Sequence, residues 1–294
     1  TKVETYNASY HGLASRLGDA QVANCASCHE AHHILPQSDP ESSVNTANLK
    51  QTCGQCHPGA SGKFVEGLVH ISVSDSHQRV LYWVRRIYLL VIFSACGFML
   101  LHNMVIVSAY IREKYARQKQ MAYVVRFPRT FVAQHLLLVS SFILLVVTGF
   151  SLSFPDSFFS SILRDGFGWG EGMRSSVHRV AAMLMIFTMV WHVISLLFSR
   201  RGRREFKALS LRKQDGLDMI WNLLYHLGVK RIKPEFDRYD YTEKIEYWAL
   251  MWGSVVMIVT GLMMWFPFAS SEWLGLSKIW VDVAAVIHYY EAWL

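Results

Sequence analysis

Two short cysteine and histidine motifs near the N-terminus carry the most specific chemistry in this sequence. Cys25-Ala26-Ser27-Cys28-His29 and Cys53-Gly54-Gln55-Cys56-His57 both follow the pattern Cys-x-x-Cys-His. In this pattern the two thiols bind a haem covalently, and the adjacent histidine supplies an axial nitrogen to the iron. A zinc ribbon or a pair of disulfides also uses paired cysteines, but neither needs a histidine directly after both pairs. The two motifs therefore predict two haems c.

A low-spin haem needs a second axial ligand, and the same segment holds further histidines. His32 and His70 are the leading distal candidates, followed by His11. His33 and His77 fit equally well as solvated side chains or as ligands of a neighbouring haem. Spacing alone does not assign a distal histidine to either iron.

A second group of histidines lies within long apolar segments, where an ionisable side chain is costly and marks a functional site. His178 and His192 are fourteen residues apart. In a helix they share one face, about 21 Å apart along the axis. With His135 and His288 in other apolar segments, this pair predicts two haems b, one near each face of a membrane.

Composition and hydropathy define the elements that must hold these ligands. The chain has 294 residues and is 52% hydrophobic, too apolar for a soluble domain and too polar for a fully embedded one. Residues 1–78 are polar and loop-rich, so haems would have to serve as their core. The fifth cysteine, Cys96, lies in an apolar run, which favours a small core residue.

Five apolar runs follow the polar segment, at residues 87–110, 130–152, 177–198, 246–268 and 278–294. The first four are long enough to span a bilayer, and the fifth stops without a cap, so an incomplete fifth helix is expected. The predicted fold is an all-α membrane protein, in which a four-helix dihaem b bundle is preceded by one extra membrane helix.

The basic residues indicate how this bundle is oriented. Residues 111–129 carry six Lys and Arg side chains and residues 199–213 carry seven, whereas residues 153–175 carry two. By the positive-inside rule the first two loops are cytoplasmic, and the haem c segment is external. This distribution explains the net charge of +7 without nucleic-acid binding. The predicted location is the bacterial inner membrane, with the haem c domain in the periplasm. The amphipathic stretch 215–226 fits a helix on the inner membrane surface and a solvated helix equally well.

Orientation sorts the membrane histidines by depth. His178 and His288 fall near the outer face and predict the outer haem b. His135 and His192 fall near the inner face and predict the inner haem b, with His102 as the reserve partner of His135. For His102 alone, a hydrogen-bonded helix contact remains the better explanation.

Short motifs accompany these histidines. They are Arg126 to His135, Thr148-Gly149-Phe150, Val177-His178-Arg179, Glu243 to Trp248, Thr260-Gly261 and His288 to Trp293. Together they resemble the formate dehydrogenase gamma and Ni,Fe-hydrogenase cytochrome b (cytochrome b561-like) superfamily over residues 126–294. The resemblance implies a four-helix bundle with two haems b that exchanges electrons with quinones. It also implies a second histidine further along the last helix, beyond residue 294, as another partner for His135.

Residues 11–58 resemble periplasmic multihaem cytochromes fused to such b modules, in which Gly often stands at the position of Glu30. The predicted organisation is a dihaem cytochrome c segment at 1–78, a membrane helix and linker at 79–125, and a cytochrome b bundle at 126–294.

The function predicted from these parts is electron transfer between menaquinol or ubiquinol and external haems c through two haems b, as a quinol:cytochrome c-type oxidoreductase subunit. The alternative is a membrane anchor and electron conduit of a larger respiratory complex without its own quinone site. Expected partners are the lipid bilayer and a periplasmic multihaem cytochrome or respiratory complex subunits. The quinone and proton candidates are His102, Asn103 and Glu291, although structural hydrogen bonding fits each of them somewhat better.

Overall fold

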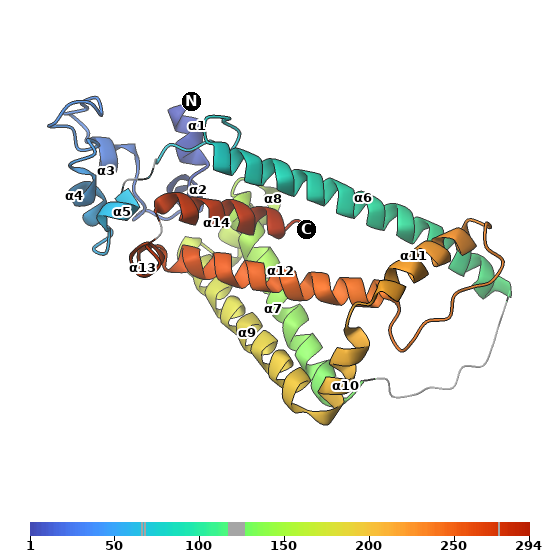
Figure 1. The fold of residues 1–294 in the computed structure, drawn as a ribbon. Coiled ribbons are helices and arrows are strands. Elements are labelled where there is room, and N and C mark those ends of the chain that lie inside the picture. The colour runs from blue at the N-terminus through green and yellow to red at the C-terminus, as the bar shows by residue number, and fades with distance from the viewer. Residues whose placement is uncertain (66, 68, 117–126, 276) are drawn as a thin grey trace. The chain divides into compact units, whose positions relative to one another are not determined.

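The computed structural model describes residues 1–65, 67, 69–116, 127–275 and 277–294. All regular elements in these residues are helical, which confirms the all-α class (Figure 1). Three basic residues of the predicted cytoplasmic loop, Arg117, Lys119 and Arg126, lie outside the described residues.

Four helices of the described chain are long and apolar enough to cross a membrane. They are α6 Arg79–Ala116, α7 Arg129–Ser153, α9 Glu171–Phe198 and α12 Tyr241–Trp265. They confirm the first four predicted segments, but each begins earlier than the apolar run because its polar first turn is also helical. Few side chains in the apolar parts of these spans are buried within the protein, as expected of helices that face lipid. Cys96 is among the exposed residues, so its prediction as a core residue is wrong: it lies on the outside of α6.

The last helix, α14 Lys278–Glu291, has 14 residues and is too short to span a bilayer within the described chain. The predicted fifth membrane helix therefore stays a prediction.

The chain forms two compact units. Unit 1 contains residues 1–87, 140–183 and 257–292, and unit 2 contains residues 88–139, 184–256 and 293–294. The sequence-based division at residues 78 and 125 concerns order along the chain and stays a prediction.

Unit 1 begins with five short helices: α1 Lys2–Asn7, α2 Tyr10–Arg16, α3 Cys25–His29, α4 Leu49–Gly54 and α5 Gly62–Val65. The first haem motif is α3 itself, whose N-terminus is capped by Asn24, and α4 leads into the second motif. Among the described hydrophobic residues of 1–65, 67 and 69–78, only Ala14, Leu17, Ala60 and Val65 are buried, so this segment has a small apolar core of its own.

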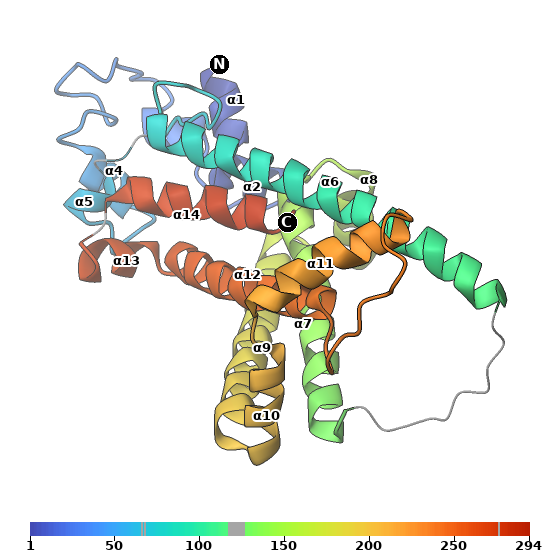
Figure 2. The same ribbon diagram turned by 45° about the vertical axis from the view of Figure 1, so that its right-hand side comes forward.

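The same unit includes the short helices α8 Phe158–Ser161 and α13 Pro267–Trp273 and the π-helical turn η1 Ile162–Gly166. Helix α5 contacts both α13 and α14. Leu81 at the start of α6 packs against Val283 and Val286 of α14, and both views show these helices side by side (Figures 1 and 2). The N-terminal segment thus belongs to the same compact body as parts of α7, α9, α12 and α14.

Unit 2 holds the basic helix α10 Arg200–Leu209 and the helix α11 Lys213–His226. Helix α11 exposes Leu217, Ile220 and Trp221 and buries Asp215 and Asn222. Because its apolar residues face outward, the membrane-surface alternative is favoured over the solvated helix.

Candidate functional site

In unit 1, each motif histidine lies opposite a second histidine. The ring centroids of His57 and His11 are 6.1 Å apart, with planes inclined by 29°. Those of His29 and His70 are 6.3 Å apart, with planes inclined by 30°. Two imidazoles on opposite sides of one iron need roughly this spacing, since each metal–nitrogen bond is about 2 Å long and each ring centre lies about 1 Å beyond its nitrogen.

These two pairs separate the distal candidates. His11 and His70 lie beside motif histidines, whereas His32, His33 and His77 are exposed. Burial lowers the pKa of His11 and of His70, which favours the neutral ring that binds metal. Cys25, Cys28, Cys53 and Cys56 of the two motifs are free cysteines in this structure.

His178 and His288, the residues predicted to bind the outer haem b, each lie beside a threonine of another helix. His178 Nδ1 of α9 lies 2.7 Å from Thr148 Oγ1 of α7, and His288 Nδ1 of α14 lies 2.9 Å from Thr260 Oγ1 of α12. Glycines follow both threonines: a Cβ at Gly149 would lie 3.7 Å from the ring of His178, and one at Gly261 would lie 3.4 Å from that of His288. The two histidines are also close enough to interact electrostatically.

A buried ion pair lies one turn before His178. Arg174 Nε and Nη2 donate to the carboxylate of Glu171 at 2.5 Å and 2.6 Å, and Arg174 Nη1 donates to the Thr148 carbonyl at 3.1 Å. Tyr10 of α2 donates to the same carboxylate at 3.0 Å. Burial and the Glu171 charge raise the pKa of Tyr10 to about 12, so this hydroxyl remains a donor at neutral pH. The contact ties α2, which carries Tyr10 and His11, to the helix that carries His178.

His135 and His192, the residues predicted to bind the inner haem b, belong to unit 2 and are arranged differently. His192 Nδ1 lies 3.0 Å from Gln134 Oε1, and His192 Nε2 lies 3.1 Å from the Tyr247 hydroxyl. Gln134 Nε2 donates to Ser195 Oγ, which turns the amide oxygen toward His192. Both ring nitrogens of His192 are therefore hydrogen-bonded. His135, the residue after Gln134, is exposed on α7.

His102 is buried and also has two side-chain partners. Its Nε2 lies 2.8 Å from the Tyr241 hydroxyl, and its Nδ1 lies 3.4 Å from Asn103 Oδ1. Asn222 Nδ2 donates to the same Tyr241 oxygen at 3.0 Å. Asn222 Oδ1, by contrast, is buried without a partner in the described residues. Of the other quinone candidates, Asn103 is exposed and Glu291, the last residue of α14, is half-buried.

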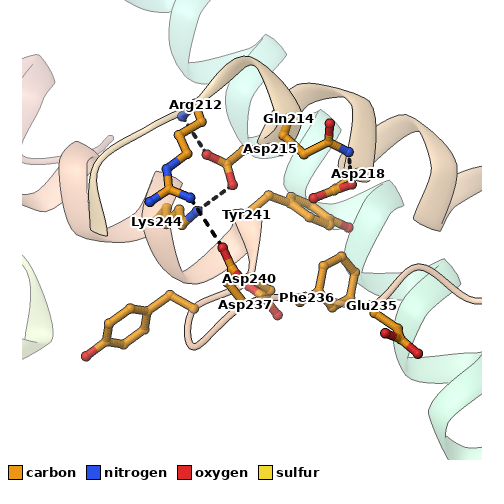
Figure 3. Close-up of a pocket in the computed structure, with 11 residues that line it drawn as sticks. Arg212, Gln214, Asp215, Asp218, Glu235, Phe236, Asp237, Asp240, Tyr241 and Lys244 are labelled. Atoms are coloured by element: carbon orange, nitrogen blue, oxygen red, sulfur yellow. Dashed lines mark hydrogen bonds and ion pairs between the residues drawn. The ribbon is translucent and has the colours of Figure 1, made fainter. Parts of the chain in front are cut away.

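A polar pocket of about 160 Å³ surrounds the start of α12 (Figure 3). Lys244, with 2% of its side chain exposed, donates to Asp215 Oδ1 at 2.6 Å. Burial alone would raise the pKa of Asp215, but the Lys244 ammonium and the Arg212 backbone N–H outweigh it and hold this pKa below its usual value. The pair fastens α12 to α11, and Trp248 Nε1 adds a bond to the Leu209 carbonyl at 2.9 Å.

The fold and these buried histidines define a helical membrane protein with the ligand chemistry of a cytochrome b. A family model described as prokaryotic cytochrome b561 matches residues 126–294. This match covers more than half of the chain, which therefore belongs to that family. No curated protein and no solved structure matches the chain.

The family implies b-type haem, and residues of unit 1 fit it. Within the described residues His178 and His288 show hydrogen bonds at Nδ1 and none at Nε2, the nitrogen left to bind iron. When bound, haem would supply one-electron chemistry to a bundle whose own side chains only bind and orient it.

The sequence analysis predicted the membrane histidines but assigned no function to the threonines and tyrosines that contact them. One signal for the threonines is present in the chain: Val147-Thr148-Gly149 is followed by Phe154-Pro155, and Val259-Thr260-Gly261 is followed at the same spacing by Phe266-Pro267. For Tyr241 and Tyr247 we find no comparable signal.

Proposed function

We propose that this protein is a membrane electron-transfer subunit that passes electrons between a quinol pool and external haems c through two haems b. One observation carries the proposal. The pairs His11–His57 and His29–His70 belong to the same compact unit as His178 and His288. The proposed sites for haem c and haem b in one compact unit support direct electron exchange between them.

In this proposal Cys25, Cys28 and His29 hold one haem c with His70 as the distal ligand. Cys53, Cys56 and His57 hold the other with His11, and His32 loses its place as a leading candidate. The ring spacings support both pairings. His11 and His70 each lie at the distance from a motif histidine that two axial ligands of one iron would have, and such a placement is not expected of a histidine that is merely solvated.

The outer haem b has His178 and His288 as its ligands, and the inner haem b has His135. For the second inner ligand His192 would have to release Tyr247, and His102 would have to release Tyr241. A histidine beyond residue 294 breaks neither bond, so it is the assignment that costs least.

The quinol site of this proposal lies at His102. Its Nδ1 faces an amide oxygen and so carries the proton, which leaves Nε2 to accept the Tyr241 hydroxyl. The hydrogen bonds from Asn222 to Tyr241 and from Tyr241 to His102 thus both point toward the imidazole. The unsatisfied Asn222 Oδ1 is an acceptor for a quinol hydroxyl, since a buried acceptor without a donor is unfavourable.

The haem c segment lies in the periplasm in this proposal, and the protein resides in the bacterial inner membrane. The basic helix α10, with Arg200, Arg201, Arg203 and Arg204, supports a cytoplasmic placement of that loop. Electrons leave or enter at the haems c through a periplasmic multihaem cytochrome or another subunit of a respiratory complex.

The test is a quantified pyridine haemochrome spectrum of the purified protein, followed by reduction with a quinol in the presence and absence of a quinone-site inhibitor. Two haems c and two haems b, reduced in an inhibitor-sensitive manner, are expected. Reduction that is insensitive to the inhibitor would favour the alternative function, an electron conduit without its own quinone site. Two haems c without haem b would refute the assignment of the membrane histidines as haem ligands. A matched pair of variants, His178→Ala and His33→Ala, separates haem b loss from a general effect of removing a histidine.

A further inference from the structure

Three histidines of the predicted haem sites share one local arrangement. His70, His178 and His288 each present Nδ1 to a threonine hydroxyl, at 3.0 Å, 2.7 Å and 2.9 Å. The threonines Thr5, Thr148 and Thr260 come from three different helices. One arrangement therefore recurs in a haem c motif region and on both sides of the outer haem b site.

The proton of each hydroxyl is directed to the backbone. Thr5 donates to the Lys2 carbonyl at 2.9 Å and Thr148 to the Leu144 carbonyl at 2.6 Å. Thr260 contacts the Met257 carbonyl at 3.4 Å, which also interacts with His288. A hydroxyl has one proton to donate. Since that proton is committed, the threonine oxygen accepts, and the imidazole must carry its own proton on Nδ1.

We propose that Thr148 and Thr260 are positioning residues that fix the Nδ1–H tautomer of His178 and His288 and turn Nε2 of both rings toward the iron. The inference rests on the proposed ligands of the outer haem b. Metal-bound histidines generally donate their other ring N–H to an acceptor, which orients the ring and raises its basicity. Here the acceptor is a neutral hydroxyl made more basic by its own bond to a carbonyl.

The repeat of Val-Thr-Gly and Phe-Pro supports a common purpose. Thr148 and Thr260 occupy the same place in it, and each contacts a histidine 30 or 28 residues further along the chain. The two halves of the bundle thus supply one hydroxyl to each axial ligand. A basic axial ligand stabilises ferric iron more than ferrous iron, so these hydroxyls lower the midpoint potential of the outer haem b.

The test uses Thr148→Val and Thr260→Val, which keep the shape and remove the acceptor, and Thr148→Ser, which keeps the hydroxyl. Thr188→Val is the matched control, because Thr188 is equally buried and donates to the Leu184 carbonyl of its own helix. The readouts are the midpoint potential of each haem in a spectroscopic redox titration and the g-values of the low-spin ferric signal, which report ring orientation.

Each valine variant is expected to raise the midpoint of the outer haem b alone. Loss of such a hydrogen-bond partner typically changes metal affinity or activity by at least about tenfold. If the ferric to ferrous ratio changes by the same factor, the midpoint potential shifts by about 59 mV for one electron. Thr148→Ser and Thr188→Val should leave the potential unchanged. Loss of haem b in Thr148→Val, but not in Thr148→Ser or Thr188→Val, would also support the inference, because only the acceptor differs.

Unchanged potentials and g-values in both valine variants would overturn the inference, as would equal effects of Thr148→Val and Thr188→Val. Failure of the proposed function is separately visible. If His178→Ala kept a full complement of haem b, the ligand assignment itself would be wrong, whatever the threonine variants showed.

Discussion

Removal of the buried charge on Glu171 should destabilise unit 1 strongly. The side chains of Arg174 and Glu171 are 6% and 2% exposed and form two short bonds. Glu171→Gln keeps the shape but leaves the guanidinium without a counter-charge. Breaking a buried pair from one side costs about 3–5 kcal/mol, because the remaining charge stays desolvated. For a protein of this size, roughly 2–4 °C of melting temperature accompany each kcal/mol.

The assay is thermal unfolding of the purified holoprotein in detergent, followed by circular dichroism and by the haem absorption. Glu171→Gln should melt at least about 6 °C below the parent protein. Asp165→Asn is the control: it breaks the Arg164–Asp165 pair, whose carboxylate is 63% exposed, and solvent-exposed pairs contribute little to stability. If the two variants melted at the same temperature, the claim that the Glu171 pair fastens the haem c segment to α9 would be refuted.

Four further outcomes are expected. His70→Ala should leave both haems c attached but convert one to a high-spin form that binds carbon monoxide, whereas His32→Ala should keep the parent spectrum; the reverse result would exchange their assignments. Tyr241→Phe should slow quinol-driven reduction and leave haem content and dithionite reduction unchanged, and an unaltered quinol rate would exclude the His102 site. Glu30 has φ 63° and ψ 168°, a region that strains all residues but glycine, so Glu30→Gly should stabilise the haem c segment by about 1 kcal/mol in denaturant unfolding; destabilisation would contradict this. The pKa of Asp215 is lower in the folded protein. Its stabilising contribution is therefore present above its unfolded pKa of about 3.9 and is lost as the pH falls through the folded value. Asp215→Asn should weaken the loss of stability at acid pH, and an identical pH dependence in the variant and the parent would refute the role of the pair.

Patterns along the chain predict the membrane segments well, because spanning a bilayer imposes a length and an apolar composition that can be read locally. Hydropathy predicts the first residues of α9 and α12 less well. Glu171, Arg174 and Lys244 look like loop residues by hydropathy, yet each is buried in an ion pair. Glu171 and Arg174 neutralise each other within α9, whereas the partner of Lys244 is Asp215, on another helix, and this pairing cannot be read from local hydropathy.

The distal histidines show the same limit. Cys-x-x-Cys-His is local and predicts a haem, whereas the partner of His29 lies beyond the second motif and that of His57 precedes the first. Chain order therefore gives no guide to the pairing. His32 is close to its motif in sequence but exposed, whereas His11 and His70, which are distant in sequence, lie beside the motif histidines.

The contacts around His178 join features that sequence analysis treats separately. Tyr10, the neighbour of His11, bonds Glu171; Glu171 bonds Arg174; and Arg174 donates to the backbone of Thr148, whose hydroxyl holds His178. One hydrogen-bonded chain thus runs from the side of a predicted haem c ligand to a predicted haem b ligand. Electron transfer between two haems requires a fixed separation, and rigidly supported ligands provide it better than mobile ones. The ion pair therefore ties the helix that carries His11 to the helix that carries His178, and in this way supports the fixed separation that the proposed electron transfer between haem c and haem b requires.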